Sequence, residues 1–226
     1  MKYLPLFLIL ILAFILRAYG LNWDQGFHLH PDERAIVLAS LPLQFPASLA
    51  EFFSAQSPLN PHFFAYGSLP MYLLKAAATI ISPFYPLGLT YDYINLIGRF
   101  LSSLFDMGTL LIIFLLGQKL FSRKVGLIAA FFYAISVFPI QAAHFYAVDT
   151  PLTFFITLTL YLLVLFYENP SKKKALLIGF LIGVSLATKT SALVIVAAVG
   201  TTLFSEFILI FIKNVHRPHI WVSHIP

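Results

Sequence analysis

The sequence predicts an all-α protein, a polytopic bundle of about six transmembrane helices with amphipathic juxtamembrane helices in its first exterior loop. Three observations support this fold class. The 226 residues are 60% hydrophobic and only 10% charged, whereas soluble proteins carry about 25% charged residues. The apolar residues form long runs that suit a hydrocarbon core about 30 Å thick. The basic residues lie in short clusters between these runs, as in membrane proteins of defined orientation.

The composition also excludes several classes of function. The formal charge of +5 does not indicate a nucleic-acid partner, because the basic residues do not share one amphipathic face. The chain contains no cysteine. Disulfides, thiolate nucleophiles and sulfur-ligated metals are therefore excluded.

The first apolar run begins after Lys2 and is closed by Arg17. Its Ala18-Tyr19-Gly20 end has the small-x-small pattern of a signal-peptidase site, so cleavage remains an alternative. An uncleaved signal anchor is the simpler interpretation, because further apolar runs follow. The expected spans cover roughly residues 3–20, 95–118, 124–142, 151–168, 174–188 and 190–212, and the fifth is short enough to be tilted or re-entrant.

Basic clusters set the expected topology through the positive-inside rule, which places them in the cytoplasm. One further apolar run, residues 70–81, should not cross the membrane, because another crossing would put the next basic cluster outside. That run is short, contains Lys75 and ends at Ser82-Pro83, which predicts an amphipathic helix at the membrane surface. The cytoplasmic clusters are Lys119, Arg123 and Lys124; Lys172, Lys173 and Lys174; and Lys213 with Arg217.

On this topology, four polar segments that are far apart in the sequence share the exterior side. The expected exterior loop, residues 21–94, holds the first two, and the others are short turns between spans. Their convergence predicts an active site that faces away from the cytoplasm. The segments are GFHLHPDER (26–34), NPHFFAYGSLP (60–70), HFYAVDTP (144–151) and TKT (188–190).

These segments carry a resemblance to a known family. The adjacent acids Asp32 and Glu33, the 60–70 loop, the RFLSSLF stretch from Arg99 and the HFYAVDTPLTFF stretch from His144 together resemble the GT-C fold glycosyltransferases. The resemblance is in particular to the dolichyl-phosphate-mannose protein mannosyltransferase and aminoarabinose transferase superfamily. It implies a transmembrane catalytic domain over residues 1–212 and a short cytoplasmic tail over 213–226. The chain resembles the amino-terminal catalytic half, so we expect it to be truncated relative to the family.

The same resemblance implies the reaction. Family members move a sugar, mannose-like or another hexose or pentose, from a polyprenyl-phosphate carrier to an acceptor hydroxyl on the exoplasmic side, with inversion. The acceptor is a lipid, a glycan or a protein. The match to the family's catalytic aspartate is Asp32, and an acid at the place of Asp149 faces the site in related transferases.

General chemistry supports these assignments. Transfer to a hydroxyl requires a base near the acceptor and positive charge near the departing phosphate. Asp32 suits the base and Lys189, at an exterior span boundary, suits the phosphate, while Glu33 could orient the base, bind a metal or hold the acceptor. Asp32 and Glu33 could instead be first-turn acids of a helix, and Asp149 could cap the next span. The catalytic candidates are Asp32, Glu33 and Asp149, and the substrate-binding candidates are Lys189, Arg99, His62, Tyr66 and His144.

Several candidates have structural alternatives. Arg99 could either snorkel to the interface or contact a phosphate. Asp106 lies deep in the second span, so we expect a structural partner such as the helix that carries Gln141. Tyr66, Tyr72 and Tyr146 could stack on a sugar or belong to an aromatic belt. No cofactor is certain, but a divalent metal is possible, with His30, Asp32, His62 and Asp149 as candidate ligands.

Two rival interpretations remain at this stage. The chain could be a truncated, inactive transferase, or a non-enzymatic transporter or scaffold. Transporters place ionisable groups near the bilayer midplane on broken helices. Here the acids mostly gather in one exterior loop and at span ends, which favours an integral, multi-pass membrane enzyme with an exterior active site.

Overall fold

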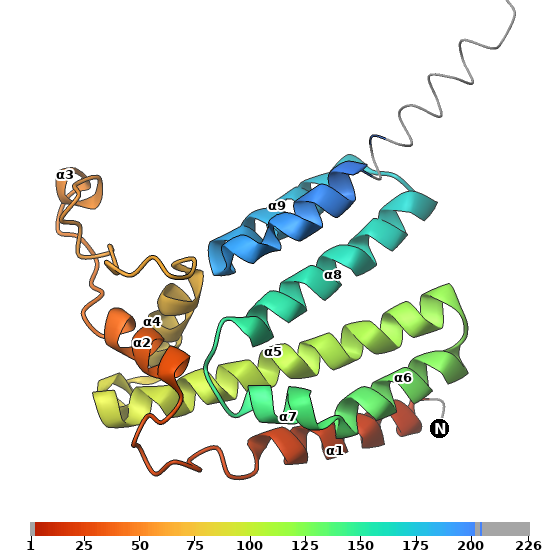
Figure 1. Ribbon diagram of the computed structural model, residues 1–226, viewed down its shortest axis with the longest axis horizontal. Coiled ribbons are helices and arrows are strands. Elements are labelled where there is room, and N and C mark those ends of the chain that lie inside the picture. Colours follow the sequence, from red (N-terminus) through yellow and green to blue (C-terminus); the bar gives the residue numbers. More distant parts are fainter. Residues whose placement is uncertain (1–2, 202–203, 205–226) are drawn as a thin grey trace, which may run out of the picture.

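The computed structural model describes residues 3–201 and 204, and in this part of the chain it contains helices and no strand. The all-α prediction is confirmed. The helices α1, α5, α6, α8 and α9 lie side by side as a bundle, and α2, α3 and α4 gather at one end of it (Figure 1). The elements are α1 (Leu4–Ala18), α2 (Pro31–Ser40), α3 (Leu49–Phe52), α4 (Leu69–Ile81), η1 (Pro86–Leu89), α5 (Tyr91–Leu120), α6 (Arg123–Ile135), α7 (Val137–Ala143), α8 (Asp149–Glu168), α9 (Lys172–Thr188) and η2 (Thr190–Ala192).

Two described helices, α5 and α8, are long and apolar enough to cross a membrane. The bent pair of α6 and α7 makes a third if it forms one span. Shorter apolar helices cover Leu4–Ala18, Leu69–Ile81 and Thr190–Thr201. The expected count of six spans is therefore not confirmed, and much of the last expected span, like the tail over 213–226, lies outside the described residues.

The expected span over 124–142 is not one straight helix. α6 and α7 meet at a 60° bend, where Ser136 has an extended backbone with ψ of 129°. Pro139 explains the break, because its ring lacks an N–H group and clashes with the carbonyl four residues earlier, that of Ile135. The hydrophobic pattern concealed this break, although the proline itself was visible.

A buried arginine occupies the broken helix end. Arg17 donates from its Nη1 atom to the Ala134 carbonyl at 3.0 Å, one of the carbonyls that a helix end leaves without intrahelical partners. Its Nη2 atom donates to the Tyr133 carbonyl at 3.4 Å, which also accepts the Ser136 N–H at 3.3 Å.

The Nε atom of Arg17 pairs with the Asp106 carboxylate, which also accepts the Tyr133 hydroxyl at 2.6 Å. The expected structural role of Asp106 is confirmed. Its partner Tyr133 belongs to the expected span over 124–142 that also carries Gln141, although Tyr133 lies on α6 and Gln141 on α7.

α4 has the amphipathic form expected for residues 70–81. Its buried residues Pro70, Met71, Leu74 and Ala78 share one face. This face belongs to a hydrophobic core with residues of α2 and α5, among them Ile36 and Ile94. The packing fixes α2 and α4 against the start of α5.

Basic residues collect at the other end of the bundle. Lys119 at the end of α5 pairs with Glu168 at the end of α8, with 2.6 Å between Nζ and Oε2. Lys174 donates to the Leu165 carbonyl at 2.8 Å. The guanidinium carbon of Arg123 lies 5.5 Å from the centre of the Tyr3 ring, beside the start of α1. Lys213 and Arg217 lie outside the described residues.

α5 and α6 approach each other closely at two glycines. A Cβ atom on Gly126 would lie 2.5 Å from the Phe114 carbonyl oxygen, and one on Gly117 would lie 2.7 Å from the Cα atom of Gly126. We predict that Gly126→Ala destabilises the fold by about 1–3 kcal/mol, because backbone must move to admit the methyl group.

Gly179→Ala is the matched control, because a Cβ atom there meets nothing within 4 Å. Alanine is the better helix former by about 1 kcal/mol, so this variant should be neutral or more stable. The check is the thermal unfolding midpoint of the purified variants in one detergent. Equal midpoints for the two variants would contradict the close approach.

Candidate active site

The end of the bundle where α2 and α4 lie (Figure 1) is organised around Arg99, which is fully buried on α5. Its Nη1 and Nη2 atoms bind the two carboxylate oxygens of Asp24 at 2.9 and 2.7 Å. Its Nε and Nη2 atoms bind the two oxygens of Glu33 at 2.8 and 2.5 Å. Its Nη1 atom also donates to the Leu21 carbonyl at 2.7 Å. The planar fork of arginine suits such paired contacts.

Glu33 carries this network to another segment. Its Oε2 atom also accepts the backbone N–H of Tyr146 at 2.9 Å, in the turn between α7 and α8. The Tyr146 hydroxyl donates to the Pro70 carbonyl at 2.7 Å, and its ring packs so closely on α5 that a Cβ atom on Gly98 would lie 2.6 Å from Cγ. Tyr146 is therefore a buried packing residue and not a sugar-stacking surface.

The sequence interpretation missed Asp24. Burial alone would raise the pKa of this carboxyl, but hydrogen bonds from Arg99 and from the backbone N–H groups of Leu29 and Gly26 hold it below 3.8. Asp24 lies in a loop without periodicity. Its one sequence signal is its place within a short polar stretch between an apolar run and the Asp32-Glu33 pair.

A second polar group lies at the same end and joins four predicted site residues from separate segments. Lys189 binds Asp149, with 2.8 Å between Nζ and Oδ1, and its Nζ atom lies 6.0 Å from the centre of the Tyr66 ring. The Tyr66 side chain in turn lies close enough to Asp32 for that carboxylate to raise the pKa of Tyr66. We call Asp32, Tyr66, Asp149 and Lys189 the polar cluster.

The cluster is more open to solvent than the Arg99 network. The Asp149 side chain is 55% exposed and that of Lys189 is 32% exposed, while Asp32 and Tyr66 are partly buried. Burial, followed by the hydrogen bond and negative charge of Asp32 and by the charge of Asp149, raises the pKa of Tyr66 to about 12. The Tyr66 hydroxyl therefore stays protonated at neutral pH and can act as a donor.

Gly67 brings the Tyr66 loop to the end of α9. Its N–H donates to the Thr188 carbonyl at 3.1 Å, and a Cβ atom on Gly67 would lie 1.9 Å from the Ala187 carbonyl oxygen. No larger residue fits without a backbone shift. This contact places Tyr66 next to Lys189.

Two expected contacts with substrates or a metal do not fit the structure, namely phosphate binding by Arg99 and metal or acceptor binding by Glu33. The side chains of Arg99 and Glu33 are fully buried and bonded to each other, so neither is available to a phosphate, a metal or an acceptor. Arg99 does not snorkel, because its guanidinium group is held by Asp24 and Glu33. The expectation that Glu33 orients Asp32 stays a prediction. The two residues are neighbours in the first turn of α2.

In the described part of the chain, no hydrogen bond joins His30, His62 or His144 to the polar cluster. His144 has its ring nitrogens 2.7 and 2.8 Å from the Ile140 and Tyr19 carbonyl oxygens, so it links α7 to the end of α1. His62 is exposed, with a φ of 49°. His30 caps α2 by accepting the Glu33 N–H through Nδ1 at 3.4 Å.

The metal expectation does not fit this arrangement. Among the residues that the structure describes, no three histidine, aspartate or glutamate side chains are grouped so that they could hold a metal ion. His30 is committed to its helix cap, and Asp149 to the Lys189 ammonium. We therefore derive no step of the chemistry from a metal.

The comparison with family models gives the decisive observation. Residues 95–224 match the model of the family described as dolichyl-phosphate-mannose-protein mannosyltransferase. The chain belongs to this mannosyltransferase family. No curated protein and no solved structure matches the chain. The matched region includes Arg99, Asp149 and Lys189, while Asp32 and Tyr66 precede it.

Membership of the mannosyltransferase family and the apolar helices identify an integral membrane protein and a membrane glycosyltransferase of the GT-C type. The resemblance expected from the sequence is thereby confirmed.

The Arg99 network gives a prediction for this mannosyltransferase-family chain. Arg99→Ala should destabilise the fold by about 3–5 kcal/mol, because it leaves two buried carboxylates without their cation. The control Lys119→Ala removes the cation of an exposed pair, whose loss should cost about 0–1 kcal/mol. Denaturant unfolding of both variants in one detergent is the measurement, and a similar loss in the two would show that the Arg99 network is not a structural centre.

Tyr66 gives a prediction that does not depend on activity. In a titration followed by tyrosinate absorbance, the difference between the chain and Tyr66→Phe should reveal one group with a pKa of about 12. Because this pKa is raised from 10.0, the neutral hydroxyl stabilises the fold below pH 10, and this contribution is lost as the pH rises from 10 to about 12. Asp32→Asn should lower the Tyr66 pKa while leaving it above 10, because burial remains. An unchanged value in Asp32→Asn would exclude their contact.

Proposed function

We propose that the chain transfers a sugar from a polyprenyl-phosphate carrier to an acceptor hydroxyl, with Asp32 as the base and Lys189 as the partner of the carrier phosphate. The observation that carries the proposal is the polar cluster, in which α2, the 60–68 loop, α8 and the end of α9 bring a carboxylate and an ammonium to one surface. The family match supports the class of reaction.

The transfer itself needs one displacement. The acceptor oxygen attacks the anomeric carbon and forms the new glycosidic bond, while the bond between that carbon and the phosphate oxygen breaks. The electron pair leaves with the polyprenyl phosphate, and Asp32 takes the acceptor proton. Attack opposite the leaving group inverts the anomeric configuration.

Each other member of the cluster has a role set by its contacts. Lys189 supplies the positive charge that stabilises the departing phosphate, where negative charge accumulates. Asp149 holds the Lys189 ammonium at 2.8 Å and so fixes its direction before the donor binds. The Tyr66 hydroxyl donates to Asp32, which orients the carboxylate, and gives way when the acceptor hydroxyl becomes the donor.

The side of the membrane follows from charge. The polar cluster lies at the end of the bundle where α5 and α8 begin, and Lys119, Arg123 and Lys174 lie where these helices end or the next ones start. Basic loops mark the cytoplasmic side. The reaction is therefore exterior, and the acceptor is a lipid, a glycan or a protein available there.

The base is tested by sugar transfer in membranes that contain the chain, supplied with a panel of radiolabelled polyprenyl-phosphate sugars. Asp32→Asn should lower the transfer rate by about 10²–10⁴-fold, the usual contribution of a general base. Asp92→Asn is the matched control, because Asp92 is an exposed first-turn acid of α5 and should leave the rate unchanged. Absence of transfer by the unmodified chain with every donor, or full activity in Asp32→Asn, would contradict the proposal.

The phosphate partner is tested in the same membranes. Lys189→Met should lower the transfer rate by about 10²-fold, as expected for loss of one stabilising charge in the transition state. Lys189→Arg should restore part of the rate, because it keeps the charge. Equal rates in the methionine and arginine variants would mean that Lys189 does not act through its charge.

A further inference from the structure

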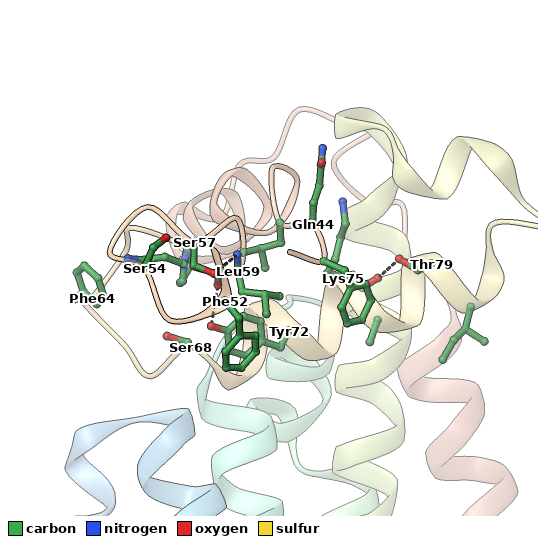
Figure 2. A pocket seen from close by; sticks show the side chains of 16 residues that line it. Gln44, Phe52, Ser54, Ser57, Leu59, Phe64, Ser68, Tyr72, Lys75 and Thr79 are labelled. Carbon is green, nitrogen blue, oxygen red and sulfur yellow. Dashed lines mark hydrogen bonds between the residues drawn. The ribbon is translucent and has the colours of Figure 1, made fainter. Parts of the chain in front are cut away.

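A large pocket lies outside the polar cluster, between the segment of residues 43–64 and the outer side of α4 (Figure 2). Its volume is about 1090 Å³, slightly above the range of about 300–1,000 Å³ for ligand sites. No member of the polar cluster lines it. The lining is Leu43, Gln44, Phe45, Phe52, Ser54, Ser57, Leu59, Asn60, Pro61, Phe64, Ser68, Tyr72, Lys75, Ala76, Thr79 and Ile80.

The pocket combines apolar walls with one positive charge. Phe52, Leu59 and Tyr72 lie together in its middle, with Lys75 and Gln44 at one side (Figure 2). Among the described residues that line it, Lys75 is the only charged one, and no carboxylate is present to pair with it.

The Lys75 ammonium is poorly neutralised where it stands. It donates to the Leu41 carbonyl at 2.8 Å, and burial lowers its pKa. A charge that has lost part of its hydration and has only a carbonyl partner gains most from an anion.

The rim of the pocket exposes large apolar side chains. Phe45 is 90% exposed, and Phe64 and Ile80 are each 74% exposed. Three neighbours outside the lining, Leu49, Phe53 and Phe84, are also exposed. An apolar surface of this kind beside membrane-spanning helices suits the interfacial layer of a bilayer, where aromatic side chains and lysine are enriched.

We propose that this pocket binds an anionic lipid of the exterior leaflet, with its acyl chains against Phe52, Leu59 and Tyr72 and its phosphate at Lys75. The exposed rim continues the apolar walls into the bilayer, so lipid chains can enter from the membrane without crossing water. A peptide occupant fits less well, because the aromatic rim would then remain exposed to water. The site is independent of the sugar-transfer reaction, whose phosphate partner is Lys189.

The test uses the full chain in phosphatidylcholine nanodiscs that contain a trace of a photoactivatable lipid, either phosphatidylglycerol or phosphatidylcholine, with the label on the acyl chain. Mass spectrometry then locates labelled peptides. Phosphatidylglycerol should label residues 43–80 about fivefold more than phosphatidylcholine does, because one lysine near a phosphate contributes about 1 kcal/mol.

Variants separate the charge from the walls. Lys75→Gln should remove the preference for phosphatidylglycerol, Lys75→Arg should keep it, and the control Lys119→Gln, at the other end of the bundle, should leave it unchanged. Ala76→Phe, which fills the pocket, should reduce labelling of residues 43–80 by both lipids. Unfolding midpoints close to that of the unmodified chain show that the variants are folded.

Three results would overturn the proposal. Equal labelling by the two lipids would exclude the role of the Lys75 charge, and labelling confined to other segments would exclude the pocket. Suppression of labelling by soluble glycerol phosphate, or by a water-soluble peptide, would show that the occupant is a free phosphate or a peptide and not a membrane lipid.

Discussion

The half of this protein that holds the polar cluster depends on one buried cation, Arg99. Arg99 binds Asp24 and Glu33 through both oxygens of each carboxylate, and Glu33 passes the connection on to the Tyr146 N–H. A single guanidinium thus joins the loop after α1, the first turn of α2, the start of α5 and the turn before α8. Burying a charge is costly unless it is paired and hydrogen-bonded, so these segments hold one another in register. The polar cluster is built on Asp32 and Asp149, each within three residues of a member of this network.

A second buried ion pair, Arg17 with Asp106, lies at the bend between α6 and α7. The 60° bend between α6 and α7 leaves carbonyls without intrahelical partners, which is costly in an apolar surrounding. Arg17 donates to one of them, that of Ala134, and also to the Tyr133 carbonyl and the Asp106 carboxylate. The ion pairs of Arg99 and Arg17 therefore differ from the polar cluster in solvent exposure. The charged side chains of both pairs are buried, whereas those of Asp149 and Lys189 are partly exposed. The buried ion pairs stabilise the fold, and the solvent-accessible charges are the ones that can bind a substrate.

Hydropathy predicted the helical membrane class and the amphipathic helix α4, because these depend on composition and local periodicity. The four residues of the polar cluster were predicted from residue type, position at span ends and the family resemblance. These signals did not predict which charges are buried. Arg99 and Glu33 are of the residue types that bind phosphates and acceptors, and only their burial and mutual ion pair in the folded chain show that they face inward. Asp24 was missed because a loop acid without periodicity gives no sign of a partner 75 positions away. The bend in the span over 124–142 was not predicted, because the average hydropathy of a segment is insensitive to a single proline such as Pro139.

The most direct test of the central claim, that the polar cluster lies on the side opposite the basic loops, is the sidedness of single cysteines. The chain contains no native cysteine, so Thr190→Cys beside the cluster and Ser122→Cys between α5 and α6 can each be read without background. Both positions are exposed. A membrane-impermeant maleimide applied to intact cells should label the cysteine at 190 and should reach the one at 122 only after permeabilisation. Labelling of position 122, but not of position 190, in intact cells would contradict the account.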